Sequence, residues 1–109
     1  MPGYPNTIVH QVAELDAAAA FLVDVVGLPL HSKGDGWVVL DNQTIAVRLF
    51  CGQECRRLCI ELQSDNPDAD ADSLSAAGLK VVEELARLDG DFRLFRGPYS
   101  IDVLLSRTY

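Results

Sequence analysis

Three cysteines are the residues whose type and spacing first suggest chemistry. Cys51, Cys55 and Cys59 form a C-x3-C-x3-C pattern, which at first sight resembles a metal-binding box. A zinc box, however, needs a fourth Cys or His nearby, and the known iron–sulfur spacings differ from this one. Cys59 also falls within a predicted strand, which a three-ligand loop does not allow. We therefore interpret all three as reduced structural thiols, which an odd count without an export signal also favours.

The two histidines are the next candidates for acid–base or metal chemistry. Neither His10 nor His31 has a second histidine or a carboxylate at ligand spacing. We interpret both as hydrogen-bonded histidines at the edge of a layer. The His10 side chain would point into the cavity only if a one-residue β-bulge reversed its direction. The chain shows no Ser-His-Asp order, phosphate-binding glycine loop or nucleophile elbow. The run Gly34-Asp35-Gly36 is interpreted as a hairpin turn only.

The charge balance limits the classes of partner. Nine Lys and Arg residues against sixteen Asp and Glu residues give a net charge of −7. Nucleic-acid binding needs clustered basic residues, and here they are scattered, so we expect no nucleic-acid partner. The same acidic field favours a cationic small molecule.

Membrane insertion is not expected either. The longest apolar run, Ala17 to Val23, is far shorter than the roughly 20 residues that span a bilayer. The N-terminus lacks the basic and apolar stretches of a secretory signal. We therefore expect no membrane partner and a cytoplasmic location.

The elements that must position these residues follow the same order in both halves of the chain. In the first half a strand at 7–13 precedes a helix that Asp16 caps and Gly27 ends. In the second half a strand at 58–62 precedes a helix capped by Asp65 or Asn66, with Pro67 in its first turn and Gly78 at its end. Three strands are predicted after each helix, at 28–32, 37–40 and 44–50 and then at 79–85, 92–95 and 100–105, with a turn at 89–91.

This repeated order predicts an internal duplication. Each helix ends in a Gly-Leu pair, and the two pairs lie about fifty residues apart. The 109 residues suit one domain, with a first βαβββ module at 6–50, a linker at 51–56 and a second module at 57–106. The predicted class is α+β, with both modules forming one curved mixed sheet whose open concave face holds a ligand.

Alternation of side chains along each strand predicts which residues face that concavity. His10 is expected under the first helix, whereas Thr7, Val9 and Gln11 face the cavity. Aromatic side chains are added as candidates for stacking on a ligand. The predicted ligand-binding residues are Gln11, Trp37, Arg48, Phe50, Arg57, Cys59, Glu61, Phe92, Tyr99 and Asp102.

Residues 12–28, VAELDAAAAFLVDVVGL, resemble the opening of the vicinal oxygen chelate superfamily. This group includes glyoxalase I, bleomycin-resistance and fosfomycin-resistance proteins, and extradiol dioxygenases. Its usual helix motif is A-x-x-F-Y-x-x-x-L-G-L, in which Leu22 here replaces the tyrosine. Residues 62–78, together with Gly97-Pro98-Tyr99, resemble the second module, so the resemblance covers nearly the whole chain.

The resemblance also implies where a metal would be held. Enzymes of the family bind a divalent ion such as Zn, Ni, Mn or Fe through His and Glu residues on the first and last strand of each module. Carried over, these positions fall at Thr7, Ala46 or Arg48, Arg57 and Asp102. Of these only Asp102 is able to bind a cation, and Arg48 and Arg57 would repel one. The resemblance therefore implies a site without a metal cofactor.

The leading hypothesis is a metal-free small-molecule-binding protein that resembles drug-sequestering antibiotic-resistance proteins and forms a homodimer. Its ligand is a small organic molecule, cationic or aromatic. The alternative is a metal-dependent lyase, isomerase or dioxygenase that uses His10, Glu61 and Asp102 as ligands. A third hypothesis is a protein-binding module that has lost its pocket. If the family's strand order holds, Arg57, Glu61 and Asp102 lie on adjacent strands, where Arg57 and Asp102 either pair structurally or bind a polar ligand.

Overall fold

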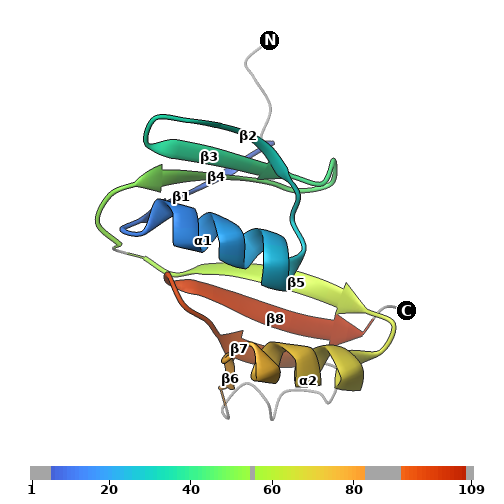
Figure 1. Cartoon of the computed structure of the whole chain (residues 1–109). Coiled ribbons are helices and arrows are strands. Elements are labelled where there is room, and N and C mark those ends of the chain that lie inside the picture. Colours follow the sequence, from blue (N-terminus) through green and yellow to red (C-terminus); the bar gives the residue numbers. More distant parts are fainter. Residues whose placement is uncertain (1–5, 55, 83–91, 108–109) are drawn as a thin grey trace. The chain divides into compact units, whose positions relative to one another are not determined.

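The chain contains two four-stranded mixed sheets, each with helical structure on one face. The computed structural model describes residues 6–54, 56–82 and 92–107. It divides the chain into two compact units, Met1–Cys55 and Arg56–Tyr109 (Figure 1). Both units follow the order strand, helix, three strands. The predicted α+β class and the two βαβββ modules are therefore confirmed.

The first unit places its first and last strands side by side. Its strand order is β1-β4-β3-β2, with β1 and β4 parallel and the other pairs antiparallel. Helix α1 contacts β3 and β4 (Figure 1). The elements are β1 (Ile8–Val12), α1 (Leu15–Phe21), the π-helix η1 (Leu22–Val26), β2 (Leu30–Gly34), β3 (Trp37–Asp41) and β4 (Ala46–Cys51).

Alternating burial shows which face of this first sheet is the core. Val12, Leu40, Val47 and Leu49 are fully buried, as are Ala18 and Leu22 of the helical segment. His10 is buried on the same side of β1 as Val12, as expected from a period of two residues. The alternate residues of each strand consequently point to the opposite side of the sheet, away from α1.

The start of the first helix differs from the prediction. The Ala18 N–H bonds to the Glu14 carbonyl at 2.9 Å, so the helix begins at Leu15 and Glu14 is its N-cap residue, without a side-chain cap. Asp16 was predicted to be the cap, but it lies in the first turn, where a carboxylate faces the positive end of the helix dipole.

The end of the same helical segment widens into a π-helix, which the apolar spacing did not predict. Both the Gly27 and the Leu28 N–H groups bond to the Leu22 carbonyl, each at 2.9 Å. Gly27 adopts a left-handed φ of 90°, a conformation that glycine adopts without strain. The predicted end at Gly27 is therefore confirmed.

The second unit repeats this arrangement. Its strand order is β5-β8-β7-β6, with β5 and β8 parallel, and α2 contacts β8 and β6 (Figure 1). The core side of β8 is formed by Ile101, Val103 and Leu105, each almost completely buried. The elements are β5 (Leu58–Ser64), α2 (Pro67–Ala76), β6 (Lys80–Val81), β7 (Phe92–Arg96) and β8 (Ile101–Arg107).

The second helix has the predicted signals at both ends. Of the two predicted cap residues it is Asn66 that caps, because its side-chain oxygen accepts from the Ala69 N–H at 3.3 Å. Pro67 occupies the first helical position, where its missing N–H costs nothing. Gly78 follows the helix with φ 96°. The rest of the strand predicted at 79–85 beyond Val82, and the turn at 89–91, lie outside the described residues.

Several element boundaries differ from the predicted ones. Strand β2 begins at Leu30 rather than Leu28, since Leu28 is buried beside the helix end. Gly34 belongs to β2 and not only to the turn, and Cys51 ends β4 instead of opening the linker. No helix in the described ranges is long and apolar enough to cross a membrane.

Candidate functional site

Four of the predicted ligand-binding residues share one face of the first sheet. In the strand register, Gln11 of β1 and Trp37 of β3 both lie beside Phe50 of β4. Arg48 projects to the same side, two residues before Phe50 on β4. Cross-strand partners project to a common face, and here it is the face opposite α1. The first unit therefore brings Gln11, Trp37, Arg48 and Phe50 together.

The indole of Trp37 is held in place by two neighbours. The guanidinium carbon of Arg48 lies 5.6 Å from the ring centroid, within the range of a cation–π interaction. On β2, Gly34 is the register partner of Trp37. A Cβ atom on Gly34 would lie 2.4–2.6 Å from Cε2, Nε1 and Cζ2 of the indole. Glycine is therefore what allows the ring to lie against β2, a role that the sequence-based turn assignment missed.

The Arg48 side chain is exposed and has no hydrogen bond or ion pair to any residue in the described ranges. The nearest carboxylate by register on this face belongs to Asp41, the partner of Ala46. That carboxylate accepts from the Gln43 N–H at 2.6 Å. Among the described residues, the face thus presents a cation without a charged partner beside two aromatic rings.

The second sheet carries the charged candidates on its corresponding face. Cys59 lies opposite Asp102, and Glu61 lies opposite Leu104, along the parallel pair β5–β8. Phe92 of β7 lies opposite Ser106. Cys59, Glu61, Phe92 and Asp102 therefore share the side of the sheet away from α2, and Arg57 immediately precedes β5.

Asp102 is the most heavily bonded of these residues. Its two oxygens accept from Arg57 Nε at 3.1 and 3.0 Å, and Oδ1 accepts from Arg57 Nη2 at 2.7 Å. The Gly97 N–H lies 3.3 Å from Oδ1, and Arg96 Nε lies 3.6 Å from it. Burial alone would raise the pKa of Asp102, but the bonds from Arg57 and Gly97 and the charges of Arg57 and Arg96 lower it below its usual value. The carboxylate is therefore ionised, and both of its oxygens accept hydrogen bonds.

Tyr99 lies in the loop before β8 rather than on a strand. Tyr99 and Ser100 both adopt left-handed backbone angles, with φ of 58° and 57°. The loop is closed by the Ile101 N–H, which bonds to the Pro98 carbonyl at 3.0 Å. Its first residue, Gly97, also accepts from Arg57 Nη2 at 2.9 Å. The loop is thus fastened to the Arg57–Asp102 pair.

Glu61 and Cys59 have separate surroundings on the same face. Glu61 accepts from the Ser106 hydroxyl at 2.9 Å and from the Gln63 amide at 3.5 Å. Burial raises the pKa of the Cys59 thiol, and the charges of Asp102 and Glu61 raise it further. Cys51 and Cys59 are both free thiols, and Cys55 lies outside the described residues. The roles of Ser106, Arg96 and Gly97 could not be predicted from the sequence, because they depend on side-chain contacts with Glu61 and Asp102.

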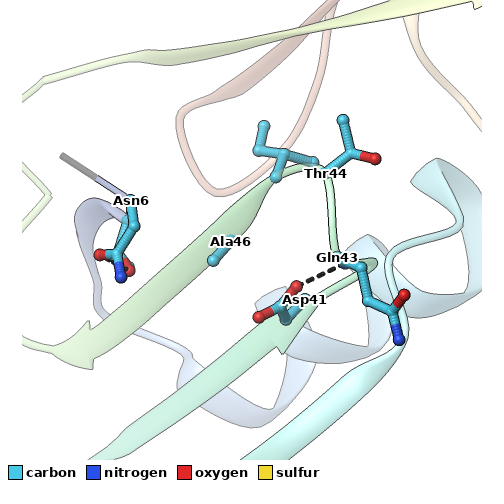
Figure 2. A pocket seen from close by; sticks show the side chains of 7 residues that line it. Asn6, Asp41, Gln43, Thr44 and Ala46 are labelled. Carbon is cyan, nitrogen blue, oxygen red and sulfur yellow. Dashed lines mark hydrogen bonds between the residues drawn. The ribbon is translucent and has the colours of Figure 1, made fainter. Parts of the chain in front are cut away.

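A polar pocket of about 310 Å³ lies at the turn between β3 and β4. Figure 2 shows Asn6, Ala46 and Thr44 around it, with Asp41 bonded to Gln43. Thr7 and Ala46, where the resemblance places two metal ligands, both line this pocket. Its full lining is Asn6, Thr7, Asp41, Gln43, Thr44, Ile45 and Ala46.

A more apolar pocket of about 380 Å³ lies on the helix side of the first unit. It is formed between α1, η1 and the sheet, and it contains none of the predicted site residues. Its lining is Asp16, Ala19, Ala20, Val23, Asp24, Leu30, Lys33 and Val38.

The donor set does not suit a divalent metal. Within the described residues, no three His, Cys, Asp or Glu side chains are grouped so that they could hold an ion. Asp102 already accepts from Arg57 through both oxygens, and Arg48 adds a cation rather than a ligand. His10 lies in the core of the first unit, whereas Glu61 and Asp102 belong to the second. His31 is exposed and contacts Ser32.

Structural comparison identifies the fold as that of the vicinal oxygen chelate proteins. The lactoylglutathione lyase of Agrobacterium tumefaciens has a TM-score of 0.73 and 20% identity, over 98% of this chain and 95% of that one. A fosfomycin resistance protein of Listeria monocytogenes has a TM-score of 0.75 and 16% identity, over 97% and 91%. A glyoxalase/bleomycin resistance protein/dioxygenase from Nocardioides has a TM-score of 0.69 and 15% identity, over 98% and 87%.

These likenesses confirm, at the level of the fold, the resemblance predicted from residues 12–28 and 62–78. Sequence comparison finds no matching family model and no matching curated protein. Because the identities are low, the activities in the names of these neighbours are not transferred with the fold.

Proposed function

We propose that this protein binds a small organic molecule without a metal ion and releases it chemically unchanged, as a sequestering protein does. The observation that carries the proposal is the state of Asp102. It is the one carboxylate at a position where the resemblance places a metal ligand, and Arg57, Arg96 and Gly97 already surround it.

A metal ion would have to displace these bonds. Hydrogen bonds between charged groups are each worth about 1.5–3 kcal/mol net. The displaced guanidinium would also remain nearby as a like charge opposing the cation. Besides Arg57 itself, the other carried-over positions offer only Thr7 and either Ala46 or the guanidinium of Arg48, so nothing compensates for this loss. The chemistry of the site therefore favours binding through aromatic and hydrogen-bonding side chains.

The two sheet faces opposite the helices supply such side chains. The first has Trp37 and Phe50 with Gln11 and Arg48, and the second has Phe92 with Glu61 and Cys59. Apolar surface with a few placed polar groups is the usual composition of a small-molecule site. The proposal extends to a homodimer and to sequestration of a drug; two of the structural neighbours are named as resistance proteins.

The test uses protein treated with EDTA and dialysed, with three probes that share one ring system and differ in charge: 2-naphthoate, 2-naphthalenemethanol and 2-naphthylmethylammonium. The proposal predicts that at least one raises the unfolding temperature saturably in the continued presence of EDTA. The NMR spectrum of the recovered probe should be unchanged. Binding that appears only after Ni, Mn or Zn is added would contradict the proposal.

A second arm addresses turnover. Lactoylglutathione and fosfomycin, named by the similar structures, are incubated with the protein with and without each metal. We expect neither to be consumed. Metal-dependent consumption of either compound would instead support the metal-dependent enzyme.

A further inference from the structure

We infer that the face of the first sheet opposite α1 contains a subsite for an aromatic carboxylate, whose anionic group pairs with Arg48 while its ring lies on Trp37 and Phe50. The inference rests on the proposed function, which it makes more specific. It depends only on residues of the first unit and on their register.

The charge of Arg48 sets the first requirement for the ligand. Its guanidinium carbon lies 5.6 Å from the centroid of the Trp37 ring, and the side chain has no hydrogen bond or ion pair in the part of the chain that the structure describes. A guanidinium offers a planar fork of N–H donors that matches a carboxylate in two parallel bonds. A cation–π contact uses none of these N–H donors, so they stay available to a ligand. An anion in the plane of the group is the natural partner.

The position of Trp37 sets the second requirement. A Cβ at Gly34 would lie only 2.4 Å from the indole, so the ring is held in a space that any larger residue would fill. Trp37 is only half-buried, which leaves part of its ring surface accessible. A large side chain fixed in this way loses little conformational entropy when a ligand stacks on it. The site is thus preorganised for a flat molecule.

Phe50 and Gln11 extend the subsite across the neighbouring strands. Trp37, Phe50 and Gln11 follow one another across three adjacent strands, spaced by about 4.8 Å each. This row is about as long as a one- or two-ring aromatic system. The Gln11 side chain lies against Gly52, with a Cβ there only 3.0 Å from its Nε2. Its amide offers a further hydrogen bond at the end of the row.

The local charge opposes the overall one. The net charge of −7 favours a cationic ligand at long range. Exposed charges are screened beyond roughly 8–10 Å at physiological salt, whereas Arg48 is directly on the face. Asp41 is the other charged group of this face in the described residues, and its carboxylate is bonded to the Gln43 N–H. Arg48 therefore determines the sign of the ligand charge.

Trp37 is the only tryptophan of the chain, so its indole N–H gives a single NMR signal that reports on this face. The EDTA-treated protein is titrated with 2-naphthoate, 2-naphthalenemethanol and 2-naphthylmethylammonium while this signal is followed. We expect naphthoate to shift it saturably with about tenfold higher affinity than the alcohol, and the ammonium probe to bind more weakly still.

Two variants separate the role of Arg48 from general charge. Arg48→Gln should reduce the affinity for naphthoate to that for the alcohol. Lys33→Gln removes the same charge from the same sheet, but Lys33 pairs with Val38 and lies on the opposite face. It should leave all three affinities unchanged. If Arg48 only covers Val39, Arg48→Gln will not alter the order of the three probes, and the inference is overturned.

The remaining outcomes distinguish this inference from the proposed function. Equal affinities, a preference for the ammonium probe, or binding that leaves the indole signal unmoved would overturn the carboxylate subsite and leave metal-free binding intact. Binding of any probe only after metal is added would overturn both. A folded Arg48→Gln variant, with an unchanged unfolding temperature, makes each comparison valid.

Discussion

The guanidinium of Arg57 donates hydrogen bonds to the carboxylate of Asp102 from two nitrogens, Nε and Nη2. The shortest of them is 2.7 Å, between Nη2 and Oδ1. The acid side chain is only 7% exposed, whereas the arginine is 39% exposed. The family's strand order predicts that Arg57 and Asp102 either pair or bind a polar ligand, and the two side chains are paired in the structure. Its position at the start of β5 and β8 also fastens the loop at Gly97. The pair therefore engages both oxygens of Asp102 and links the start of β5 to the loop before β8.

Replacing Arg57 and replacing Asp102 should have non-additive effects on stability. In Arg57→Gln the buried carboxylate loses its main donor, and we expect a loss of about 1–3 kcal/mol, at the lower end because the arginine is partly exposed. The double variant Arg57→Gln/Asp102→Asn should lose less than the sum of the single variants. Urea unfolding of the four proteins measures the coupling. Strict additivity would contradict the pairing.

The stability contributed by Asp102 should depend on pH in a definite direction. Its folded-state pKa is lowered, so its ionised form binds more strongly in the folded state. The contribution is complete above the unfolded-state pKa of about 3.9 and is lost as the pH falls through the folded-state value. The excess stability of the wild type over Asp102→Asn should be constant above about pH 5 and shrink below pH 4. An excess that persists unchanged at pH 2 would refute this assignment.

Gly34 should be intolerant of even one added methyl group. In Gly34→Ala the new Cβ would collide with Trp37, and either the ring or the strand must move. We expect a loss of about 1–3 kcal/mol in unfolding free energy together with a displaced indole NMR signal. Lys33→Ala, one residue away and on the other face of β2, is the matched control and should leave the signal in place. An unmoved indole in Gly34→Ala would show that the glycine is not needed.

Cys59 should be a slow nucleophile at neutral pH. Its raised pKa leaves less thiolate than its ordinary value of 9.0 would give, and the thiolate is the reactive form. We expect iodoacetamide to modify it more slowly than free glutathione at pH 8, as followed by mass spectrometry in a Cys51→Ser/Cys55→Ser background. Glu61→Gln removes one of the charges that raise the pKa and should accelerate the reaction. The same rate in both proteins would argue against an electrostatic effect of Glu61.

The features of the fold that could be predicted depend on local signals. Gly27 and Gly78 end their helical segments because each adopts a positive φ, and Asn66 caps α2 through its own side chain. The π-helix at Leu22–Val26 could not be predicted, because the apolar pattern of this stretch fits both an α-helix and a wider turn. Asp16 was misassigned for a related reason, since a carboxylate is favourable both as a cap and in the first turn.

The sequence could predict which residues of the candidate site share a sheet face, but not which side chains contact one another. Period-two alternation correctly grouped Gln11, Arg48 and Phe50, because that grouping needs only the parity of each strand. The cation–π contact of Arg48 with Trp37 is a diagonal contact between strands, and it depends on a register that the sequence does not specify. The close approach of Gly34 to the indole depends on the same register. A Lys-Gly-Asp-Gly-Trp run is equally typical of an ordinary hairpin.

The most direct test of the central claim is calorimetric titration of Ni, Mn and Zn into EDTA-treated, dialysed protein. Metal-free binding predicts no saturable one-to-one heat for any ion, apart from weak binding at the exposed His31, which should vanish in His31→Ala. A saturable one-to-one heat that persists in His31→Ala and disappears in Asp102→Asn would contradict the account.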